Sequence, residues 1–443
     1  MRNNIVHIGA GELTYEIRAI VEIAEKLQRL GVSVNMENIG DPVTKGERIP
    51  RWMKEIVADL AMQDCSYAYC PTKGLLATRQ FLAERTNARG GIQIAPDDII
   101  FFNGLGDAIQ KVYGLLRREA RVIGPSPTYS THSSGEAAHA GQRPVSYLLD
   151  PANNWYPDLA DLRLSVQYNP SISGLLIINP DNPTGAVYPE HVLREMIGIA
   201  REFDLFVICD EIYNNMTYNG QVTRPISDLV GEVPAIAMKG ISKEVPWPGA
   251  RCGWIEVYNA DKDPVFRRYV QSILDSKMVE VCSTTLPQKA IPGILSHPEY
   301  PAYLEQRKRR YEEYSNIAYD ILREVPGLKV NRTNGAFYMA VAFEEGALGE
   351  RQTLPIANAG VRELVEKLVA APGIAPDKRF VYYLLASAGI CVVPLSSFCT
   401  RELGFRVTLL EPDREVFTGI FRTLAAKISE YLASAGGRAR AVG

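Results

Sequence analysis

Residues 240–254 read GISKEVPWPGARCGW, with a single lysine, Lys243, followed by a single arginine, Arg251. The stretch comes directly after the apolar run 235–238, which has the length of a buried strand. A lysine amine at the end of a strand can form a Schiff base with an aldehyde. The planar guanidinium of an arginine suits a phosphate group. Pyridoxal phosphate (PLP) carries both an aldehyde and a phosphate, and it needs both of these residues.

Two further motifs lie upstream, each directly after an apolar run. NPDNPTG occupies residues 179–185, and CDEIY occupies residues 209–213. Together with SK and PGARCGW, these motifs resemble those of the class I and II aminotransferases of PLP fold type I, in order and in approximate spacing. The resemblance can be followed from about Gly40 to Arg406, and the ordered set is far more specific than any one motif.

The alternation of strands and helices predicts an α/β fold. Short apolar runs at 98–102, 121–123, 174–178, 205–209 and 235–238 alternate with helical spacing at 107–113 and 190–200. This alternation is typical of a mostly parallel sheet with helices on both faces. The resemblance implies a large PLP-binding domain over residues 49–300, with a sheet of the seven-stranded type. It also implies a smaller α+β domain formed by residues 1–48 and 301–443.

After residue 300 the pattern changes to long helices and short strands. Helices are predicted over 301–324 and after Asp413, and strands near 337–340, 390–393 and 405–409. Such a pattern fits an α+β domain. The segment 344–377 is longer than the family usually has at that place, and its sequence indicates no role.

Composition narrows the classes of function. A chain of 443 residues with 46% apolar and 22% charged residues is expected to form two domains of an ordinary globular protein. The net charge of -3 gives no reason to expect a nucleic acid or a membrane as partner. No run approaches the roughly 18 apolar residues of a membrane helix. The seven cysteines form no CxxC pair, so we expect a reduced, cytoplasmic location and no metal site.

Polar side chains cluster where the predicted strands end. They are Asn103, Tyr129, Asn182, Asp210 and Lys243. Ligands of open α/β sheets bind in the crevice at the carboxyl ends of the strands. The organisation of the chain therefore predicts one composite site, independently of the resemblance.

The resemblance implies a role for several of these residues. Lys243 matches the Schiff-base lysine, whose released amine can move a proton between the substrate and the cofactor. Asp210 matches the aspartate that pairs with the pyridine nitrogen and favours the protonated ring. Tyr213 and Asn182 match the residues that hydrogen-bond the phenolic oxygen of the cofactor. Tyr129 matches the aromatic residue that stacks on its ring.

The phosphate of the cofactor is expected at a strand-to-helix turn. Gly104 and Leu105 lie at such a turn, where backbone N–H groups and the helix dipole favour an anion. Ser242 and Arg251 are expected to complete the phosphate site. The resemblance also implies that Tyr69 reaches the phosphate of a neighbouring subunit. We therefore expect a homodimer with shared active sites.

Substrate binding is expected to centre on a second arginine. Arg406 matches the arginine that clamps the α-carboxylate of the substrate by two parallel hydrogen bonds. The backbone of Gly40 and the side chain of Asn182 match residues that meet the same carboxylate.

Two positions depart from patterns of the family. Gly240 stands where many members have a serine or threonine whose hydroxyl binds the phosphate. The loss of this hydrogen bond is expected to weaken cofactor binding by about 1–2 kcal/mol. Aspartate-specific members have an arginine about four residues before the serine that corresponds to Ser283. This chain has Val279 there, so a preference for dicarboxylates is not supported.

The predicted function is that of a PLP-dependent aminotransferase. It would move an amino group between an L-amino acid and a 2-oxo acid by a ping-pong mechanism through Lys243. The segment YCPTKGL, residues 69–75, is closer to alanine-type members. Other reactions of the fold remain open, namely a C–S lyase, a decarboxylase or an ACC-synthase-like enzyme. A PLP-binding regulator without turnover is also open, although no basic helix-turn-helix pattern precedes Gly40.

Overall fold

Strand residues of the central sheet alternate between two buried faces. The computed structural model describes residues 5–13 and 16–434. In β6 (Ile172–Ile178), Leu175 and Ile177 belong to one apolar cluster, whereas Leu176 and Ile178 belong to another. All four side chains are almost fully buried. Burial on both faces explains why such strands are continuous apolar runs in the sequence.

The central sheet has eight strands. Their order is β2 (Ile99–Phe102), β9 (Gly253–Tyr258), β8 (Ala235–Gly240), β7 (Phe206–Asp210), β6, β3 (Arg121–Ser126), β4 (Ser146–Asp150) and β5 (Tyr156–Pro157). β3, β4, β6, β7 and β8 pair in parallel, and β9 runs antiparallel to both of its neighbours. The prediction of a mostly parallel sheet in an α/β fold is confirmed. The two-residue β5 extends the seven expected strands to eight.

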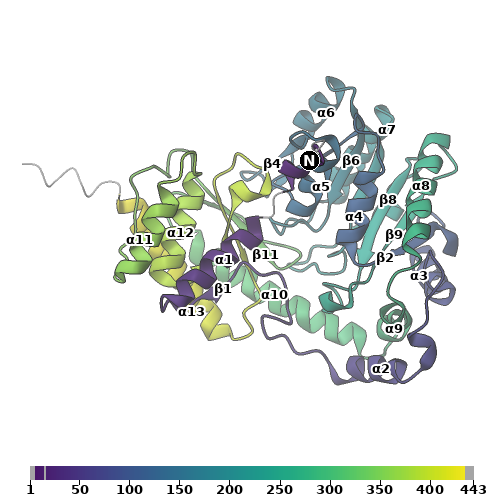
Figure 1. The fold of residues 1–443 in the computed structure, drawn as a ribbon, viewed down its shortest axis with the longest axis horizontal. Coiled ribbons are helices and arrows are strands. Elements are labelled where there is room, and N and C mark those ends of the chain that lie inside the picture. Colours follow the sequence, from purple (N-terminus) through teal and green to yellow (C-terminus); the bar gives the residue numbers. More distant parts are fainter. Residues whose placement is uncertain (1–4, 14–15, 435–443) are drawn as a thin grey trace, which may run out of the picture.

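Helices cover both faces of this sheet (Figure 1). The cluster of Leu175 and Ile177 includes residues of α2 (Arg51–Ala61), α3 (Leu76–Asn87), α6 (Leu159–Gln167), α7 (Glu190–Glu202) and α9 (Thr285–Leu295). The cluster of Leu176 and Ile178 includes residues of α4 (Leu105–Gly114) and α8 (Pro264–Glu280), and α5 (Ser130–Ala140) packs beside α4. Asp158 and Asp263 cap α6 and α8, since each carboxylate accepts two backbone N–H groups at the start of its helix.

A second, smaller lobe contains the C-terminal part of the chain (Figure 1). Its antiparallel sheet has the order β10 (Leu328–Val330), β11 (Tyr338–Phe343), β14 (Gly404–Thr408) and β13 (Val393–Pro394). The helices of this lobe are α1 (Glu16–Arg29), α11 (Ala359–Val369), α12 (Pro376–Ala388) and α13 (Arg414–Ala433). The side chain of Asp413 caps the start of α13. The N-terminal strand β1 (Asn35–Met36) pairs in parallel with β12 (Ile390–Cys391). The long helix α10 (Tyr300–Leu322) runs from the larger lobe into the smaller one.

Three general features bear on function. Among the described residues, no helix is both long enough and apolar enough to cross a membrane. The same part of the chain contains no group of histidine, cysteine and acidic side chains that could hold a metal ion. All seven cysteines are unpaired thiols.

Candidate active site

The carboxyl ends of the parallel strands open into a cavity of about 630 Å³ to which both lobes contribute. Ten of the predicted site residues line it: Gly40, Leu105, Tyr129, Asn182, Asp210, Tyr213, Ser242, Lys243, Arg251 and Arg406. Gly104 lies directly beside Arg251. Tyr69 is not among the lining residues, and 86% of its surface is exposed. The packing of the two lobes therefore brings together residues that are more than 350 positions apart, such as Gly40 and Arg406.

Lys243 lies in the turn that follows β8. Its amine donates a hydrogen bond to the carbonyl oxygen of Gly40 (2.6 Å). A Cβ atom at Gly40 would lie 1.9 Å from the hydroxyl oxygen of Tyr338, so only glycine allows this close approach. The amine is thus held in the cavity between a loop of the N-terminal segment and the edge of the central sheet.

Asp210 is the last residue of β7 and is 4% exposed. One of its oxygens lies 3.1 Å from Nε2 of His132, and the other accepts the N–H of Ile212 (3.1 Å). Nδ1 of His132 lies 3.2 Å from the hydroxyl of Tyr113. Burial raises the pKa of Tyr113 well above its ordinary value, so this phenol stays protonated and can donate to His132. His132 then carries its ring proton on Nε2 and can donate it to Asp210.

Sequence reasoning missed His132 and Tyr113. Tyr113 lies on α4, and His132 lies on α5 three residues after Tyr129, so the two meet only because these helices pack together. The only local signal was the nearness of His132 to Tyr129, which is the N-cap residue at the start of α5.

Tyr213 and Tyr338 meet at one wall of the cavity. The hydroxyl of Tyr213 donates to that of Tyr338 (3.2 Å), and each residue is 3% exposed. Burial, together with the nearby Tyr338, raises the pKa of Tyr213 well above its ordinary value. Tyr213 is therefore a hydrogen-bond donor at neutral pH. The sequence did not predict a role for Tyr338. The guanidinium carbon of Arg406 lies over the ring of Tyr338, 4.5 Å from the ring centre.

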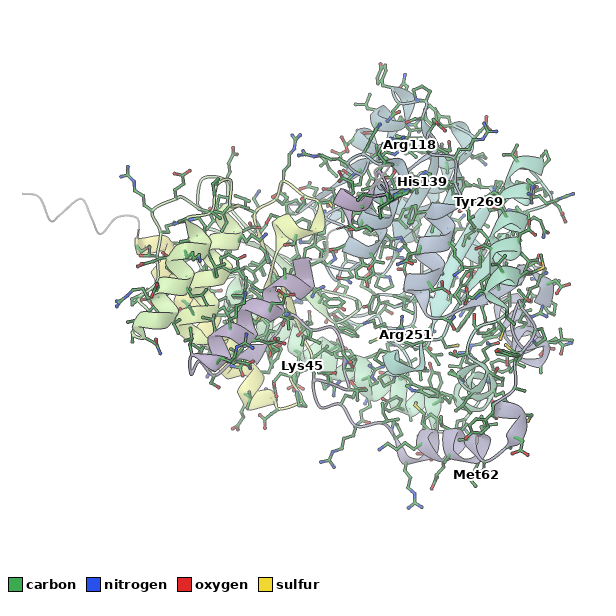
Figure 2. The ribbon with its side chains drawn as sticks, viewed as in Figure 1. Lys45, Met62, Arg118, His139, Arg251 and Tyr269 are labelled. Atoms are coloured by element: carbon green, nitrogen blue, oxygen red, sulfur yellow. The ribbon has the colours of Figure 1, made fainter. Side chains whose placement is uncertain are left out.

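Arg251 approaches the start of α4. It adopts a left-handed backbone conformation (φ 47°), and it lies toward the middle of the molecule (Figure 2). A Cβ atom at Gly104 would lie 2.5 Å from Nη2 of Arg251, so a glycine is needed for the guanidinium to reach this helix end. The N–H of Gly104 donates to the carbonyl of Phe102 (2.8 Å). The N–H of Asp107 donates to the carbonyl of Gly104 (3.2 Å), which leaves the N–H groups of Leu105 and Gly106 at this helix start to bind an anion.

Arg406 lies on β14 and is 2% exposed. Its Nη2 donates to the carbonyl of Asn38 (2.6 Å), and its Nη1 donates to Oδ1 of Asn182 (3.3 Å). A buried guanidinium with fixed direction at the wall of a cavity can receive a carboxylate in bidentate geometry.

The loop 179–185 contains a second buried acid. Asp181 is fully buried, and its carboxylate accepts the N–H and the hydroxyl of Thr184. Burial raises the pKa of Asp181 to about 7, with Asp210 adding to the shift. The side chain of Asn182 is fixed beside this acid at the wall of the cavity.

These residues fit PLP. A phosphate would meet Arg251 and the start of α4, the ring would lie against Tyr129, and the ring nitrogen would face Asp210. The cavity also contains the amine that an aldehyde requires.

The family model of the class I and II aminotransferases matches residues 37–416. The chain belongs to this family. It is 59% identical to an uncharacterized aminotransferase of Methanocaldococcus jannaschii, over 98% of this chain and 100% of the relative. It is 31% identical to the glutamate-pyruvate aminotransferase AlaA of Escherichia coli, over 73% of this chain and 79% of that protein.

A solved structure agrees with these matches. The alanine aminotransferase of Pyrococcus furiosus superposes with a TM-score of 0.81 at 29% identity, over 97% of this chain and 100% of that chain. The fold is therefore fold type I, as predicted from the motifs. The chain is an aminotransferase that depends on PLP, and it transfers an amino group by the ping-pong mechanism of its family.

Proposed function

We propose that Lys243 is the residue that binds the cofactor and that the cavity around it binds an L-amino acid and then a 2-oxo acid. The observation behind this proposal is that Lys243, Asp210, Arg251 and Arg406, from three separate segments, surround one cavity. When bound, PLP supplies an aldehyde that accepts the amino group and a ring that takes up the electrons released at the α-carbon.

Each residue then has a distinct task. The carboxylate of Asp210 would hold a proton on the pyridine nitrogen. Asn182 would donate to the phenolic oxygen, as would Tyr213 once its O–H turns away from Tyr338. Tyr129 packs on the face of the ring. The amine of Lys243, once released, moves a proton between the α-carbon of the substrate and the cofactor.

The two ends of the ligands are bound separately. The phosphate is bound by Arg251, Ser242 and the segment Gly104–Leu105. The α-carboxylate of the substrate is bound by Arg406, with Asn182 and the backbone of Gly40 beside it. This clamp orients the α-hydrogen toward Lys243.

We infer that L-alanine and pyruvate form one substrate pair. Among the described residues that line the cavity, the cationic side chains are Lys243, Arg251 and Arg406, and each already has a task. None of the described lining residues offers a further cation for a second carboxylate, which favours a small, uncharged side chain. The name of the Pyrococcus furiosus relative, alanine aminotransferase, agrees with this choice, and the name of the Escherichia coli relative includes pyruvate.

We also propose a homodimer with shared active sites in the cytoplasm. Met62, Tyr67 and Tyr69 are 85%, 79% and 86% exposed on the segment that joins α2 and α3. Large apolar side chains grouped in this way are typical of a protein interface. Because Tyr69 lies outside its own cavity, it would serve the phosphate of the partner. The seven unpaired thiols fit a reducing compartment.

Visible absorption spectra test this function. The band of the PLP-loaded protein should disappear when L-alanine is added and return with a 2-oxo acid. Reduction with borohydride followed by peptide mass spectrometry should place the cofactor on Lys243. Lys243→Ala should show no turnover while its circular dichroism spectrum matches that of the wild type.

Two outcomes would contradict the proposal. Full turnover by Lys243→Ala would remove this lysine from the mechanism. A band that no amino acid changes would instead favour a lyase with another substrate or a regulator without turnover.

A further inference from the structure

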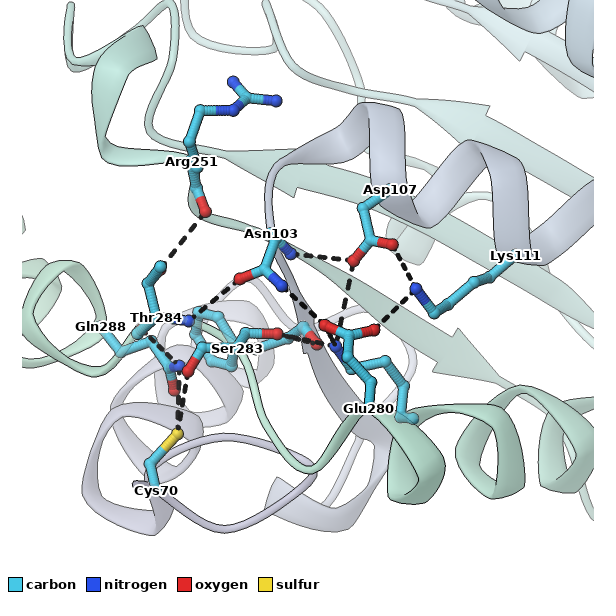
Figure 3. Close-up of polar contacts among 11 residues, drawn as sticks. Cys70, Asn103, Asp107, Lys111, Arg251, Glu280, Ser283, Thr284 and Gln288 are labelled. Atoms are coloured by element: carbon cyan, nitrogen blue, oxygen red, sulfur yellow. Dashed lines mark hydrogen bonds and ion pairs between the residues drawn. The ribbon is translucent and has the colours of Figure 1, made fainter. Parts of the chain in front are cut away.

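A group of charged side chains lies behind the start of α4 (Figure 3). It consists of Asp107 and Lys111 on α4 and of Lys277 and Glu280 on α8, and we call it the α4–α8 ion cluster. Two cations and two carboxylates balance each other in charge. The side chain of Lys277 is fully buried, whereas that of Lys111 is 20% exposed. A buried lysine is rare and requires partners.

Lys277 joins the end of α8 to the central sheet. Its amine donates to Oε1 of Glu280 (2.7 Å) and to the hydroxyl of Ser283 (2.9 Å). The hydroxyl of Ser283 in turn donates to the carbonyl of Phe101 on β2 (2.9 Å). The amine also lies 3.9 Å from Oδ2 of Asp107. The contacts of Lys277 thus connect α8, the loop after it, β2 and α4.

Asn103, the residue before Gly104, is held by the same groups. Its side-chain Nδ2 donates to Oε1 of Glu280 (2.6 Å), and its side-chain Oδ1 accepts the N–H of Thr284 (3.1 Å). Its backbone N–H donates to Oδ2 of Asp107 (3.0 Å). The position of Gly104 is therefore fixed from behind by the ion cluster.

The turn after α8 is strained. Val281 has φ 81° and ψ -71°, a region that a β-branched residue rarely adopts. It lies between Glu280 and Ser283, and Lys277 is bonded to both. The bonds of the buried amine therefore span the strained residue and stabilise the turn.

The same turn contacts Arg251. The hydroxyl of Thr284 donates to the carbonyl of Arg251 (3.3 Å). Figure 3 shows that this carbonyl faces the turn, whereas the guanidinium points away from the ion cluster. One network thus supports the backbone of Arg251 and the residue before Gly104.

We propose that Lys277 is a positioning residue for the phosphate site of the cofactor. The inference rests on the proposed function, in which the phosphate is bound by Arg251 and Gly104–Leu105. Lys277 acts through Glu280 and Ser283, which fix Asn103 and the turn beside Arg251. Its charge also offsets Asp107 and Glu280, which would otherwise repel a phosphate dianion at this helix end.

Cofactor affinity of the full-length protein tests this role. Protein freed of PLP is titrated with PLP and with pyridoxal, which lacks the phosphate. Lys277→Met should raise the Kd for PLP by about tenfold or more and leave the Kd for pyridoxal within about twofold. Lys111→Met is the matched control, because it shares both carboxylates but does not contact Ser283, and should raise the Kd for PLP by less than about threefold.

Several outcomes would overturn the inference. An unchanged Kd for PLP in Lys277→Met would do so, as would an equal loss for PLP and pyridoxal, which would indicate general damage. If Lys277→Met does not fold, Ser283→Ala removes one of the two hydrogen-bond partners of the amine. A few-fold rise in Kd for PLP alone is then expected, and the absence of any phosphate-specific change would reject the role.

Arg251→Met separates this inference from the proposed function. Suppose that Arg251→Met weakens the binding of PLP but not of pyridoxal, while Lys277→Met weakens the binding of neither. In that case only the role of Lys277 is wrong. If Arg251→Met leaves the affinity for PLP unchanged, the phosphate site itself is assigned wrongly.

Discussion

The two ends of the cofactor cavity differ in burial and in charge. At one end, Asp210 is 4% exposed and connects to His132 and Tyr113 through a single line of buried groups. At the other end, Arg251 is exposed, and the ions behind it form a branched network. Because charges interact most strongly where water is excluded, the buried end is suited to tuning reactivity. The exposed end is suited to binding. Asp210→Asn and Arg251→Met test this division directly.

Asp210→Asn should have the largest effect. The amide keeps the shape of the carboxylate but cannot hold a proton on the pyridine nitrogen, so kcat should fall on the order of 10³-fold. The Kd for PLP should change little. Steady-state kinetics and a PLP titration measure the two quantities. A variant that loses PLP but keeps its turnover would reverse the roles of the two ends.

Arg406→Ala should raise the KM for L-alanine by about 100-fold, because two charge-assisted hydrogen bonds to the α-carboxylate are lost. Arg406→Lys keeps the charge without the bidentate geometry, so its KM for L-alanine should lie between those of Arg406→Ala and the wild type. The KM values come from initial rates at saturating 2-oxo acid. An unchanged KM would place the α-carboxylate elsewhere in the cavity.

Arg251→Met should act on binding alone. Loss of the charged contacts to the phosphate should raise the Kd for PLP by about 10- to 100-fold. At saturating PLP, kcat should remain within about threefold of the wild type, because the contact is the same in the ground and transition states. Fluorescence titration and kinetics with added PLP check both values. A large fall in kcat would show that the exposed end also tunes reactivity.

The smallest expected effect is that of the Asp181 carboxyl on the pH dependence of the free energy of unfolding. The pKa of its carboxyl is raised to about 7 by burial. The unfolded chain therefore loses this proton at a lower pH than the native protein. As pH rises from about 4 to 7, this group should lower the free energy of unfolding by a few kcal/mol at most, with no further change above pH 7.

Asp181→Asn should lack this decrease. Urea unfolding at pH 5 and pH 8 compares the two proteins, and the wild type should lose more stability between these values than the variant. Parallel curves for both proteins would mean that Asp181 is ionised in the native state throughout.

At both ends, the residues that face the cavity were more predictable from sequence than the residues behind them. Asp210 and Lys243 follow apolar runs of strand length, so their position at the sheet edge could be predicted from local pattern. His132 contacts Asp210 across 78 positions, and Asn103 contacts Glu280 across 177. Nothing near Lys277 in the sequence distinguishes it from a surface lysine. Contacts of this kind depend on how helices pack.

The sequence by itself determined the strands, the motifs after them and hence the family and its cofactor. These depend on apolar periodicity, turn residues and chemistry within a few positions. Only the tertiary structure decided that His132 and Tyr113 support Asp210, that Tyr338 lies between Tyr213 and Arg406, and that a buried lysine lies behind Gly104. Such contacts follow from the order of strands in the sheet and the packing of α4, α5 and α8, which bring distant residues into one low-dielectric environment.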